Sequence, residues 1–138
     1  MRYCSVPTND DIVWCLFPDL LGARGPKPRP ALVIEVGVDG NNKTVVTVVY
    51  GATKKLNRLY PSEFKIQKTD GASFNISSLA AATKLDCNHQ VNLAYCTTWF
   101  VTAPRQLYVN QPKLGVLAPN LVARAKQAFD CSRKLRMS

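Results

Sequence analysis

The 138-residue sequence predicts a single, mainly β domain: a small barrel or sandwich of short strands with one C-terminal helix. Short β-branched and aromatic segments recur along the first hundred residues, and clusters of glycine, proline and asparagine separate them. The hydrophobic period changes only after Pro119, where apolar residues begin to repeat at helical spacing. Apolar residues make up 46% of the chain, which is enough for one packed core in a domain of this length.

A proline-rich connection interrupts the first strands of the predicted barrel. Residues 11–17 (DIVWCLF) have the apolar, β-branched and aromatic character of a buried strand. Residues 18–30 (PDLLGARGPKPRP) contain four prolines and two glycines, which predicts a long, partly stiffened loop. Residues 31–37 (ALVIEVG) and 44–50 (TVVTVVY) are the next two strands. Between them, residues 39–42 (DGNN) carry a hairpin-turn signal.

The second half of the barrel is less regular in sequence. Residues 52–61 (ATKKLNRLYP) predict a second basic loop. Further short strands are expected at residues 63–67, 74–79, 83–86, 91–95 and 99–101. Residues 103–119 contain three prolines. They predict an extended excursion that lies outside a core barrel of residues 10–102.

The end of the chain predicts an amphipathic helix over about residues 119–131. Asn120 is expected to cap the helix, and Leu121, Val122, Ala125 and Phe129 share one helical face. Such a helix would cover one end of the barrel. The basic residues 132–138 are expected to form a tail after it, and residues 1–10 a short arm before the barrel.

The charge balance favours a polyanionic partner. Eighteen Lys and Arg residues oppose nine Asp and Glu residues, which gives a formal net charge of +9. Each Lys or Arg that contacts a phosphate releases condensed counterions, so a basic protein of this kind tends to bind nucleic acid. The N-terminus does not resemble a signal peptide, and no apolar run is long enough to cross a bilayer. We therefore expect a cytosolic protein without a membrane partner.

Several kinds of catalytic site are excluded or disfavoured. One histidine, His89, rules out a His–His acid/base pair, and the nine carboxylates are too scattered for a two-metal nuclease. The five cysteines include no C-x-x-C pair, and the spacing of Cys87, His89 and Cys96 matches no standard zinc site. We therefore expect no metal, no cofactor and reduced thiols, with Cys15 in the core.

Two basic loops remain as the candidate site. Arg24, Lys27 and Arg29 lie in the first loop, and Lys54, Lys55 and Arg58 lie in the second. If residues 31–37 and 44–50 pair as a hairpin, Arg29 and Thr53 meet at the same end of the barrel. An arginine fork there could stabilise negative charge on a phosphoryl group, while Thr53 adds a hydrogen bond. Loops that only hold phosphates remain the alternative.

Four short motifs together resemble the PemK/MazF-like toxin family. They are residues 11–14 (DIVW), 28–34 (PRPALVI), 48–55 (VVYGATKK) and 82–86 (ATKLD). The first two resemble the strand, loop and R-P-strand that open the family's sequences. The third occupies the place of a family strand that ends in a small residue and Ser or Thr. The fourth resembles a later strand with a hydrophobic-Asp step. The resemblance covers about residues 10–102.

The resemblance implies an SH3-like β-barrel, usually a homodimer, that cuts single-stranded RNA without a metal and leaves a cyclic phosphate. It also implies an acidic cognate antitoxin from an adjacent gene, with DNA contacted only through the antitoxin complex. Arg29 matches the family's catalytic arginine, and Thr53 matches its Ser/Thr partner. The expected RNA-binding residues are Arg24, Lys27, Lys54, Lys55, Arg58 and Lys84.

Two departures from the family pattern leave the general acid and base unassigned. Some members carry an Arg and an Asp two residues apart where this chain has the uncharged residues 77–81, and others carry a histidine in the first loop. Lys27, Lys54 or Lys84 could act if neighbouring cations depressed the pKa. The departures keep a non-catalytic nucleic-acid-binding relative as an alternative. A gyrase-directed toxin is disfavoured because residues 131–133 do not resemble that family's C-terminus.

Overall fold

The computed structural model describes residues 6–18, 24–103 and 111–137, with side chains for residues 6–16, 28–103 and 111–133. Residues 1–5 of the predicted arm, including Cys4, therefore lie outside the described residues, as do residues 19–23 of the predicted first loop and residues 104–110 of the excursion. The side chains of Arg24 and Lys27, two of the predicted RNA-binding residues, also lie outside them.

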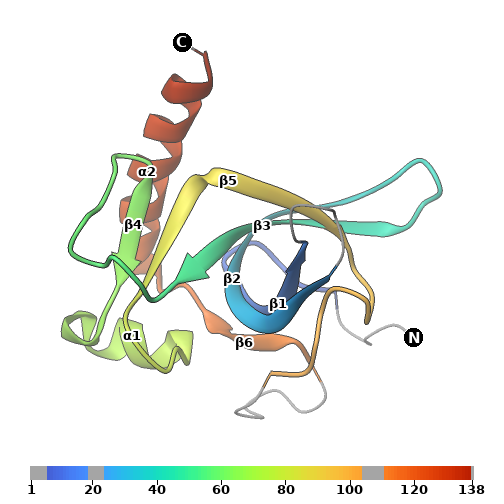
Figure 1. Cartoon of the computed structure of the whole chain (residues 1–138), viewed down its shortest axis with the longest axis horizontal. Helices are drawn as coiled ribbons and strands as arrows, with labels where there is room; N and C mark the ends of the chain where they lie inside the picture. Colours follow the sequence, from blue (N-terminus) through green and yellow to red (C-terminus); the bar gives the residue numbers. More distant parts are fainter. Residues whose placement is uncertain (1–5, 19–23, 104–110, 138) are drawn as a thin grey trace.

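Six antiparallel strands form one strongly curled sheet, in the order β4-β5-β3-β2-β1-β6, and a C-terminal helix packs on it (Figure 1). This half-barrel confirms the predicted class of a mainly β domain with a terminal helix. The strands are β1 Asp11–Pro18, β2 Arg24–Val38, β3 Thr44–Ala52, β4 Glu63–Ile66, β5 Thr83–Ala94 and β6 Lys113–Val116. The helices are the 3-10 turn η1 Lys68–Asp70, α1 Ala72–Ser77 and α2 Pro119–Met137.

The predicted first loop is wrong from residue 24 onward, because β2 begins there and pairs with β1 through Leu16–Pro28, Trp14–Pro30 and Cys15–Arg29. Prolines are tolerated in β2 because their backbone nitrogens, which carry no N–H group, point away from β1. Trp14 and Leu16 donate their N–H groups away from β2, to Pro112 and Trp99. Their cross-strand partners Pro28 and Pro30 are therefore non-hydrogen-bonded with β1, so no ladder bond to β1 is lost.

The β2–β3 hairpin follows the prediction. The Asp39 side chain accepts hydrogen bonds from the Asn41 and Lys43 N–H groups at 2.8 and 3.0 Å, and Asn42 takes a left-handed φ of 62°. The two strands pair from Val38 opposite Thr44, next to the turn, to Ala31 opposite Tyr50 at the far end.

Other predicted elements in the second half need correction. Residues 74–79 are not a strand, because α1 occupies Ala72–Ser77 and buries Ser73, Phe74 and Ser77 at helical spacing. The two strands expected at 83–86 and 91–95 are one strand, β5, with a register shift between them. Residues 99–101 contribute only an isolated bridge between Phe100 and Cys15. Strand β6 lies inside the segment that was expected to form an extended excursion.

Helix α2 is longer than predicted, because it continues through the expected basic tail to Met137. It begins at Pro119, and Asn120 is its second residue; the Asn120 side chain accepts a hydrogen bond from Ser73 Oγ at 2.7 Å. The predicted cap is therefore wrong. Leu121 and Ala125 are buried as expected, whereas Val122 is exposed. No helix in the described part of the chain is long and apolar enough to span a membrane.

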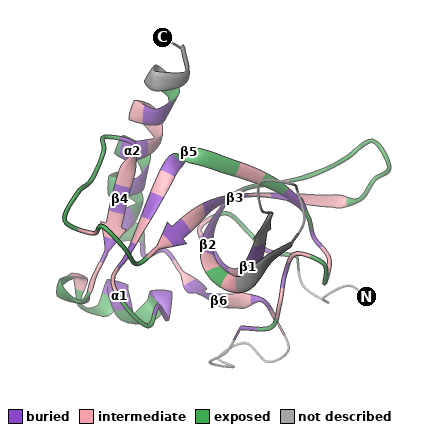
Figure 2. Cartoon of the chain, viewed as in Figure 1, coloured by how far each residue is buried: buried purple, intermediate pink, exposed green. Residues whose placement is uncertain are grey.

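The two faces of the sheet carry separate core clusters. Figure 2 shows the buried positions along the strands and α2. Ile12, Leu32, Val49 and Leu85 face α2 and pack in one cluster with its Leu121, Ala125 and Ala128. The alternate residues of the same strands, among them Val13, Cys15, Ala31 and Val48, form a second cluster that Tyr95 and Phe100 join. Side chains of a strand alternate between faces, so this division tells which face each remaining side chain occupies.

Arg124 fixes α2 to the turn after β4, and its loss should destabilise the fold. Its guanidinium donates two hydrogen bonds to the Asp70 carboxylate, at 3.2 and 3.1 Å, and one to the Lys65 carbonyl at 2.8 Å. Burial alone would raise the pKa of Asp70, but the bonds from Arg124 and the Gln67 N–H outweigh it, and the pKa is lowered. We expect Arg124→Met to reduce the free energy of unfolding by about 1 kcal/mol at neutral pH, since the site is partly exposed.

The pH dependence separates this ion pair from lost packing. Because the pKa of Asp70 is lowered in the fold, its contribution exists above an unfolded value of about 3.9 and disappears as the pH falls through the folded value. Urea unfolding of parent and Arg124→Met should therefore differ at pH 7 and converge at low pH. The control is Arg133→Met on the same helix, where the ion pair with Asp130 is exposed. Equal losses at both pH values would contradict the assignment.

Candidate nucleic-acid site

The face of the sheet opposite α2 is left partly open at the β4–β5–β3–β2 end. Arg29 follows the alternation of Ala31 and Val33, and Tyr50 that of Val46 and Val48, so both lie on the face of the second core cluster. The same face carries Ala52, which pairs with Lys84 of β5, and Lys84 in turn pairs with Lys65 of β4. We call this surface of Arg29, Tyr50, Ala52, Lys84 and Lys65 the open face.

Arg29 is exposed and is held beside an aromatic ring. Its guanidinium carbon lies 5.1 Å from the centroid of the Tyr50 ring, a cation–π distance. Partial burial raises the pKa of Tyr50, an effect that the Arg29 charge opposes, so the phenol is neutral at pH 7. The thiol of Cys15, which pairs with Arg29 across β1 and β2, is buried, and burial raises its pKa to about 12. Neither neighbour therefore carries a negative charge that would neutralise Arg29.

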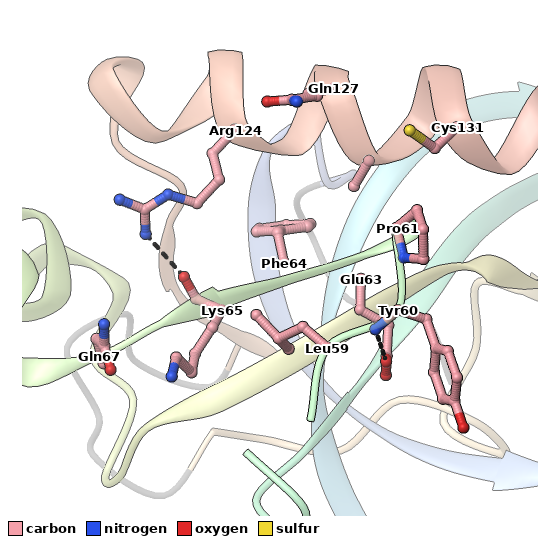
Figure 3. A pocket seen from close by; sticks show the side chains of 11 residues that line it. Leu59, Tyr60, Pro61, Glu63, Phe64, Lys65, Gln67, Arg124, Gln127 and Cys131 are labelled. Carbon is pink, nitrogen blue, oxygen red and sulfur yellow. Dashed lines mark hydrogen bonds between the residues drawn. The ribbon is translucent and has the colours of Figure 1, made fainter. Parts of the chain in front are cut away.

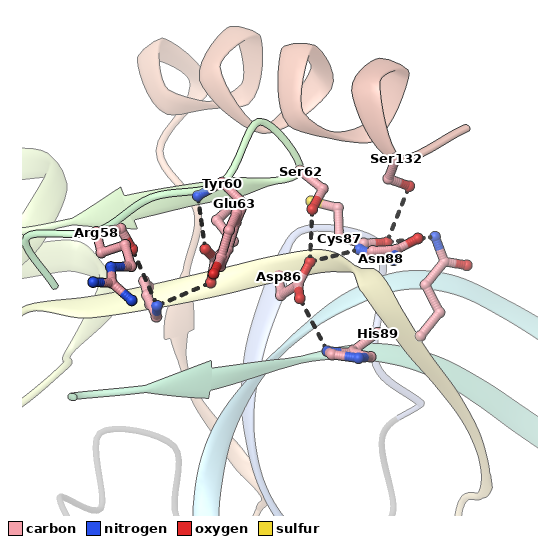
Figure 4. A network of polar contacts seen from close by, with 11 residues as sticks. Arg58, Tyr60, Ser62, Glu63, Asp86, Cys87, Asn88, His89 and Ser132 are labelled. Atoms are coloured by element: carbon pink, nitrogen blue, oxygen red, sulfur yellow. Dashed lines mark hydrogen bonds and ion pairs between the residues drawn. The ribbon is translucent and has the colours of Figure 1, made fainter. Parts of the chain in front are cut away.

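Lys65 and Lys84 of the open face, together with Glu63, hold the second basic loop against the sheet; in the structure this loop spans residues 53–62, between β3 and β4. Lys65 Nζ donates to the Leu56 carbonyl and Lys84 Nζ to the Arg58 carbonyl, each at 3.3 Å. Glu63 accepts a hydrogen bond from the Tyr60 N–H at 2.8 Å and forms an ion pair with Lys84 at 3.1 Å (Figure 4). The loop therefore has defined anchors at three of its residues, and the side chains of Lys54, Lys55 and Arg58 remain exposed.

Lys84 occupies a different environment from Lys54, Lys55 and Arg58. Only 12% of its side chain is exposed, and its ammonium group is already paired with Glu63. The direct contacts of Lys84 are with the loop and Glu63. Its contact with RNA stays a prediction, as do those of Lys54, Lys55 and Arg58.

Thr53 lies at the predicted end of the sheet but in a different hollow from Arg29. Extending the β2–β3 register beyond Ala31–Tyr50 places Arg29 level with Ala52 and Pro28 level with Thr53. Thr53 lines a hollow of about 420 Å³ together with residues 67–69, 81 and 82, a set that does not include Arg29. Register thus brings the two residues to the same end of the sheet, and a direct contact between them stays a prediction.

The region where some family members carry an Arg and an Asp is not part of the open face. Ser77 is the last residue of α1, Ser78 caps it in a left-handed conformation, and Leu79 is buried in the α2-side core. Because these three positions are buried, a charged side chain at any of them would lie inside the fold and not on the open face.

Sequence reasoning missed a carboxylate–imidazole pair beside Tyr50. Asp86 Oδ2 lies 2.9 Å from His89 Nδ1, and Asp86 Oδ1 accepts hydrogen bonds from Ser62 Oγ at 3.0 Å and the Asn88 N–H at 2.9 Å (Figure 4). His89 is 77% exposed. The available signal was the spacing D-x-x-H around the one histidine, which is weak without knowledge of the strand geometry.

A second hollow lies along the outer edge of β4 and shares Lys65 with the open face. Its volume is about 390 Å³, and it is bounded by Leu59, Tyr60 and Phe64 on one side and by Arg124, Gln127 and Cys131 of α2 on the other (Figure 3). Arg124 crosses one end of this hollow to reach the Lys65 carbonyl. Arg29 is not among its lining residues.

Comparison with known proteins agrees with this geometry. The family model for PemK-like, MazF-like toxins of type II toxin–antitoxin systems matches residues 9–92. No curated protein matches the chain in sequence. Among solved structures, Mycobacterium tuberculosis toxin MazF-mt6 is similar, with a TM-score of 0.59 at 15% identity over 90% of this chain and 96% of that one.

A second solved structure is an endoribonuclease in complex with its cognate antitoxin, from mycobacterial species. It has a TM-score of 0.59 at 15% identity over 94% of this chain and 97% of that one. At this identity the two structures support the fold, whereas the family match spans more than half of the sequence and includes both Arg29 and Thr53. The chain therefore belongs to the family of PemK-like, MazF-like toxins of type II toxin–antitoxin systems.

Proposed function

We propose that this toxin is a metal-independent endoribonuclease that cuts single-stranded RNA by attack of a 2′-hydroxyl on the neighbouring phosphate. The observation that carries the proposal is the exposed Arg29 guanidinium on the open face, held by the Tyr50 ring beside an anchored basic loop. As the 2′-oxygen attacks, negative charge grows on the phosphoryl oxygens. Arg29 can donate two parallel hydrogen bonds to those oxygens, and these bonds strengthen as the charge develops.

The exposed lysines and arginine of the loop supply binding rather than chemistry in this proposal. Lys54, Lys55 and Arg58 would contact phosphates on either side of the cleaved bond, and each contact adds a salt-dependent increment of affinity. Thr53, at the end of β3, would hydrogen-bond the reacting phosphate or orient the arginine. In this proposal Arg29 stabilises charge and does not transfer a proton, because a guanidinium holds its protons firmly.

The same proposal includes the partners of the toxin. A similar endoribonuclease has been solved with its cognate antitoxin, and a chain with a net charge of +9 suits an acidic antitoxin. We expect a homodimer in the cytosol that contacts DNA only through its antitoxin complex.

Cleavage of a defined RNA pool in EDTA tests the activity. We expect the purified protein to cut single-stranded RNA at a restricted set of sequences and to leave a 2′,3′-cyclic phosphate and a 5′-hydroxyl. The matched control is the same oligonucleotide with one 2′-O-methyl group at the cleaved position, which should bind and stay intact. RNA that is bound but never cut would favour the non-catalytic relative. Cleavage of the methylated oligonucleotide would exclude attack by the 2′-hydroxyl.

A further inference from the structure

We propose that His89 is the general base that removes the proton from the attacking 2′-hydroxyl, and that Asp86 is the residue that positions it. The inference rests on the proposed ribonuclease function and adds the group that the family comparison leaves unassigned. Its starting point is the irregular part of β5. Val49 pairs with Gln90 and Gly51 pairs with Leu85, so the four residues 86–89 of β5 stand opposite the single residue Tyr50 of β3, three more than a regular ladder needs.

The extra residues are held firmly from the α2 side. The Cys87 side chain is fully buried, and its N–H donates to the Ser62 carbonyl at 2.8 Å. Its carbonyl accepts hydrogen bonds from Ser132 Oγ of α2 at 3.2 Å and from Gln90 Nε2 at 3.1 Å. Figure 4 shows α2 on one side of β5 and the Asp86–His89 pair on the other. The backbone that carries the pair is therefore fixed, as a catalytic group requires.

The pair lies on the open face, next to the ring that holds Arg29. Asp86 alternates with Lys84 along β5 and pairs with Glu63 of β4, which sets its side chain on that face. Tyr50 lies on the strand between β5 and β2, with Arg29 on one side and the bulge of His89 on the other. Two strand spacings amount to about 10 Å, a span that the Arg29 and His89 side chains can bridge around one phosphodiester.

The hydrogen bonds of Asp86 select the chemically useful form of the imidazole. One carboxylate oxygen is engaged by Ser62 and Asn88, and the other faces His89 Nδ1. A neutral imidazole that donates from Nδ1 has its free electron pair on Nε2. Because the ring is largely exposed, Nε2 is open to a bound ribose. Asp86 would also stabilise the imidazolium that forms when the proton arrives.

The proton and bonds balance in one step. The 2′-hydroxyl proton moves to His89 Nε2 as the bond from O2′ to phosphorus forms and the bond from phosphorus to O5′ breaks. Arg29 stabilises the charge on the phosphoryl oxygens, and the leaving 5′-oxygen takes a proton from water. The imidazolium then returns its proton to solvent, and the enzyme is ready for another turnover.

The neighbouring charges leave His89 as the group that should govern activity below neutral pH. The other titratable or charged groups around it on the open face are Asp86, Glu63, Lys84, Tyr50 and Arg29. A general base works only when it is unprotonated, so the acid side of the pH–rate profile should depend on the presence of His89.

The test compares His89→Ala with Asn88→Ala under single-turnover conditions in EDTA, after thermal melting has shown that both fold. Asn88 is exposed on the same bulge, and its alanine variant keeps the N–H that binds Asp86. We expect His89→Ala to cut about a hundredfold more slowly, to lose the acid side of the pH profile and to bind an uncleavable 2′-deoxy oligonucleotide as the parent does. Added imidazole should restore part of its rate. Asn88→Ala should match the parent.

Asp86→Asn checks the positioning role separately. It should slow cleavage about tenfold or more without weakening RNA binding, and nitrogen NMR of the single histidine should report loss of the pure Nδ1–H tautomer. If His89→Ala keeps the parent's rate and pH profile, or if imidazole restores nothing, this inference is overturned while the ribonuclease proposal stands. If the parent cuts no RNA at all, the proposed function fails and this inference fails with it.

Discussion

Replacing Arg29 by alanine should slow RNA cleavage about a thousandfold, which corresponds to about 4 kcal/mol of lost transition-state stabilisation. The reason is that the guanidinium meets charge that develops only during the reaction. Its contribution to binding is one cation among the many of a chain with a net charge of +9. The loss should therefore appear in kcat, with KM changing only a few-fold.

Two further variants separate charge from geometry at this position. Arg29→Lys keeps the positive charge but loses the two-pronged donor, so it should recover only part of the activity. Arg133→Ala removes the same charge from an exposed position near the C-terminus of α2 and should cut RNA at the parent's rate. Measuring kcat and KM of all four proteins on one oligonucleotide decides the matter. A loss in Arg29→Ala that lies wholly in KM would assign Arg29 to phosphate binding alone.

The surroundings of Arg29 explain why a surface arginine could be effective. Pro28 and Pro30 restrict the backbone on either side of it, and pairing with Cys15 anchors that backbone in the sheet. The Tyr50 ring then limits the side chain, with an interaction that is usually worth about 0.5–1 kcal/mol when exposed. Less rotamer freedom has to be given up when a phosphate binds, which is how a preorganised donor differs from a mobile one.

The proline-rich segment shows where local sequence signals misled the prediction. Prolines at alternate positions indicate a loop if each missing N–H is counted as a lost ladder bond. In the structure the backbone nitrogens of Pro28 and Pro30 point to the same side of β2, away from β1, although both residues pair with β1. Pairing of β2 with β3 starts only at Ala31. Because the prolines occur at alternate positions, the segment can form a strand without losing hydrogen bonds to β1. Whether a proline costs such a bond depends on which strand lies beside its nitrogen, and the local sequence does not contain this information.

The candidate site likewise contains residues that local sequence signals indicate and residues that they do not. Arg29 and the basic loop were predictable because a short motif and hairpin register place them, and both features are local in sequence. Tyr50 looked like an ordinary strand residue, and the Asp86–His89 pair fell where the sequence suggested a break between two strands. That break is a register shift within β5, which turns a gap in the hydrophobic pattern into a fixed bulge beside Tyr50. Only the pairing of three strands reveals the arrangement.

Replacing Gly115 by alanine should destabilise the fold by about 3 kcal/mol or more, the largest stability effect that we expect from a single methyl group. Gly115 lies in β6 where the strand passes the end of α1. A Cβ atom there would collide with three backbone atoms of α1, the nearest being the Ser77 carbonyl oxygen. Backbone cannot rotate away as a flexible side chain can. The strand or α1 would have to shift, and Phe74 and Leu79 would shift with the helix.

Gly37→Ala is the matched control, because it adds the same methyl group to a glycine of β2 that has nothing within 4 Å of the new Cβ. Its free energy of unfolding should change little or rise by up to about 1 kcal/mol, since alanine restricts the unfolded chain more than glycine does. Urea unfolding at neutral pH measures both variants against the parent. Losses that agree within about 0.5 kcal/mol would show that α1 does not press on β6. A large loss confined to Gly115→Ala would show that a helix unseen in the sequence pattern constrains the adjacent strand, because only backbone contact requires glycine there.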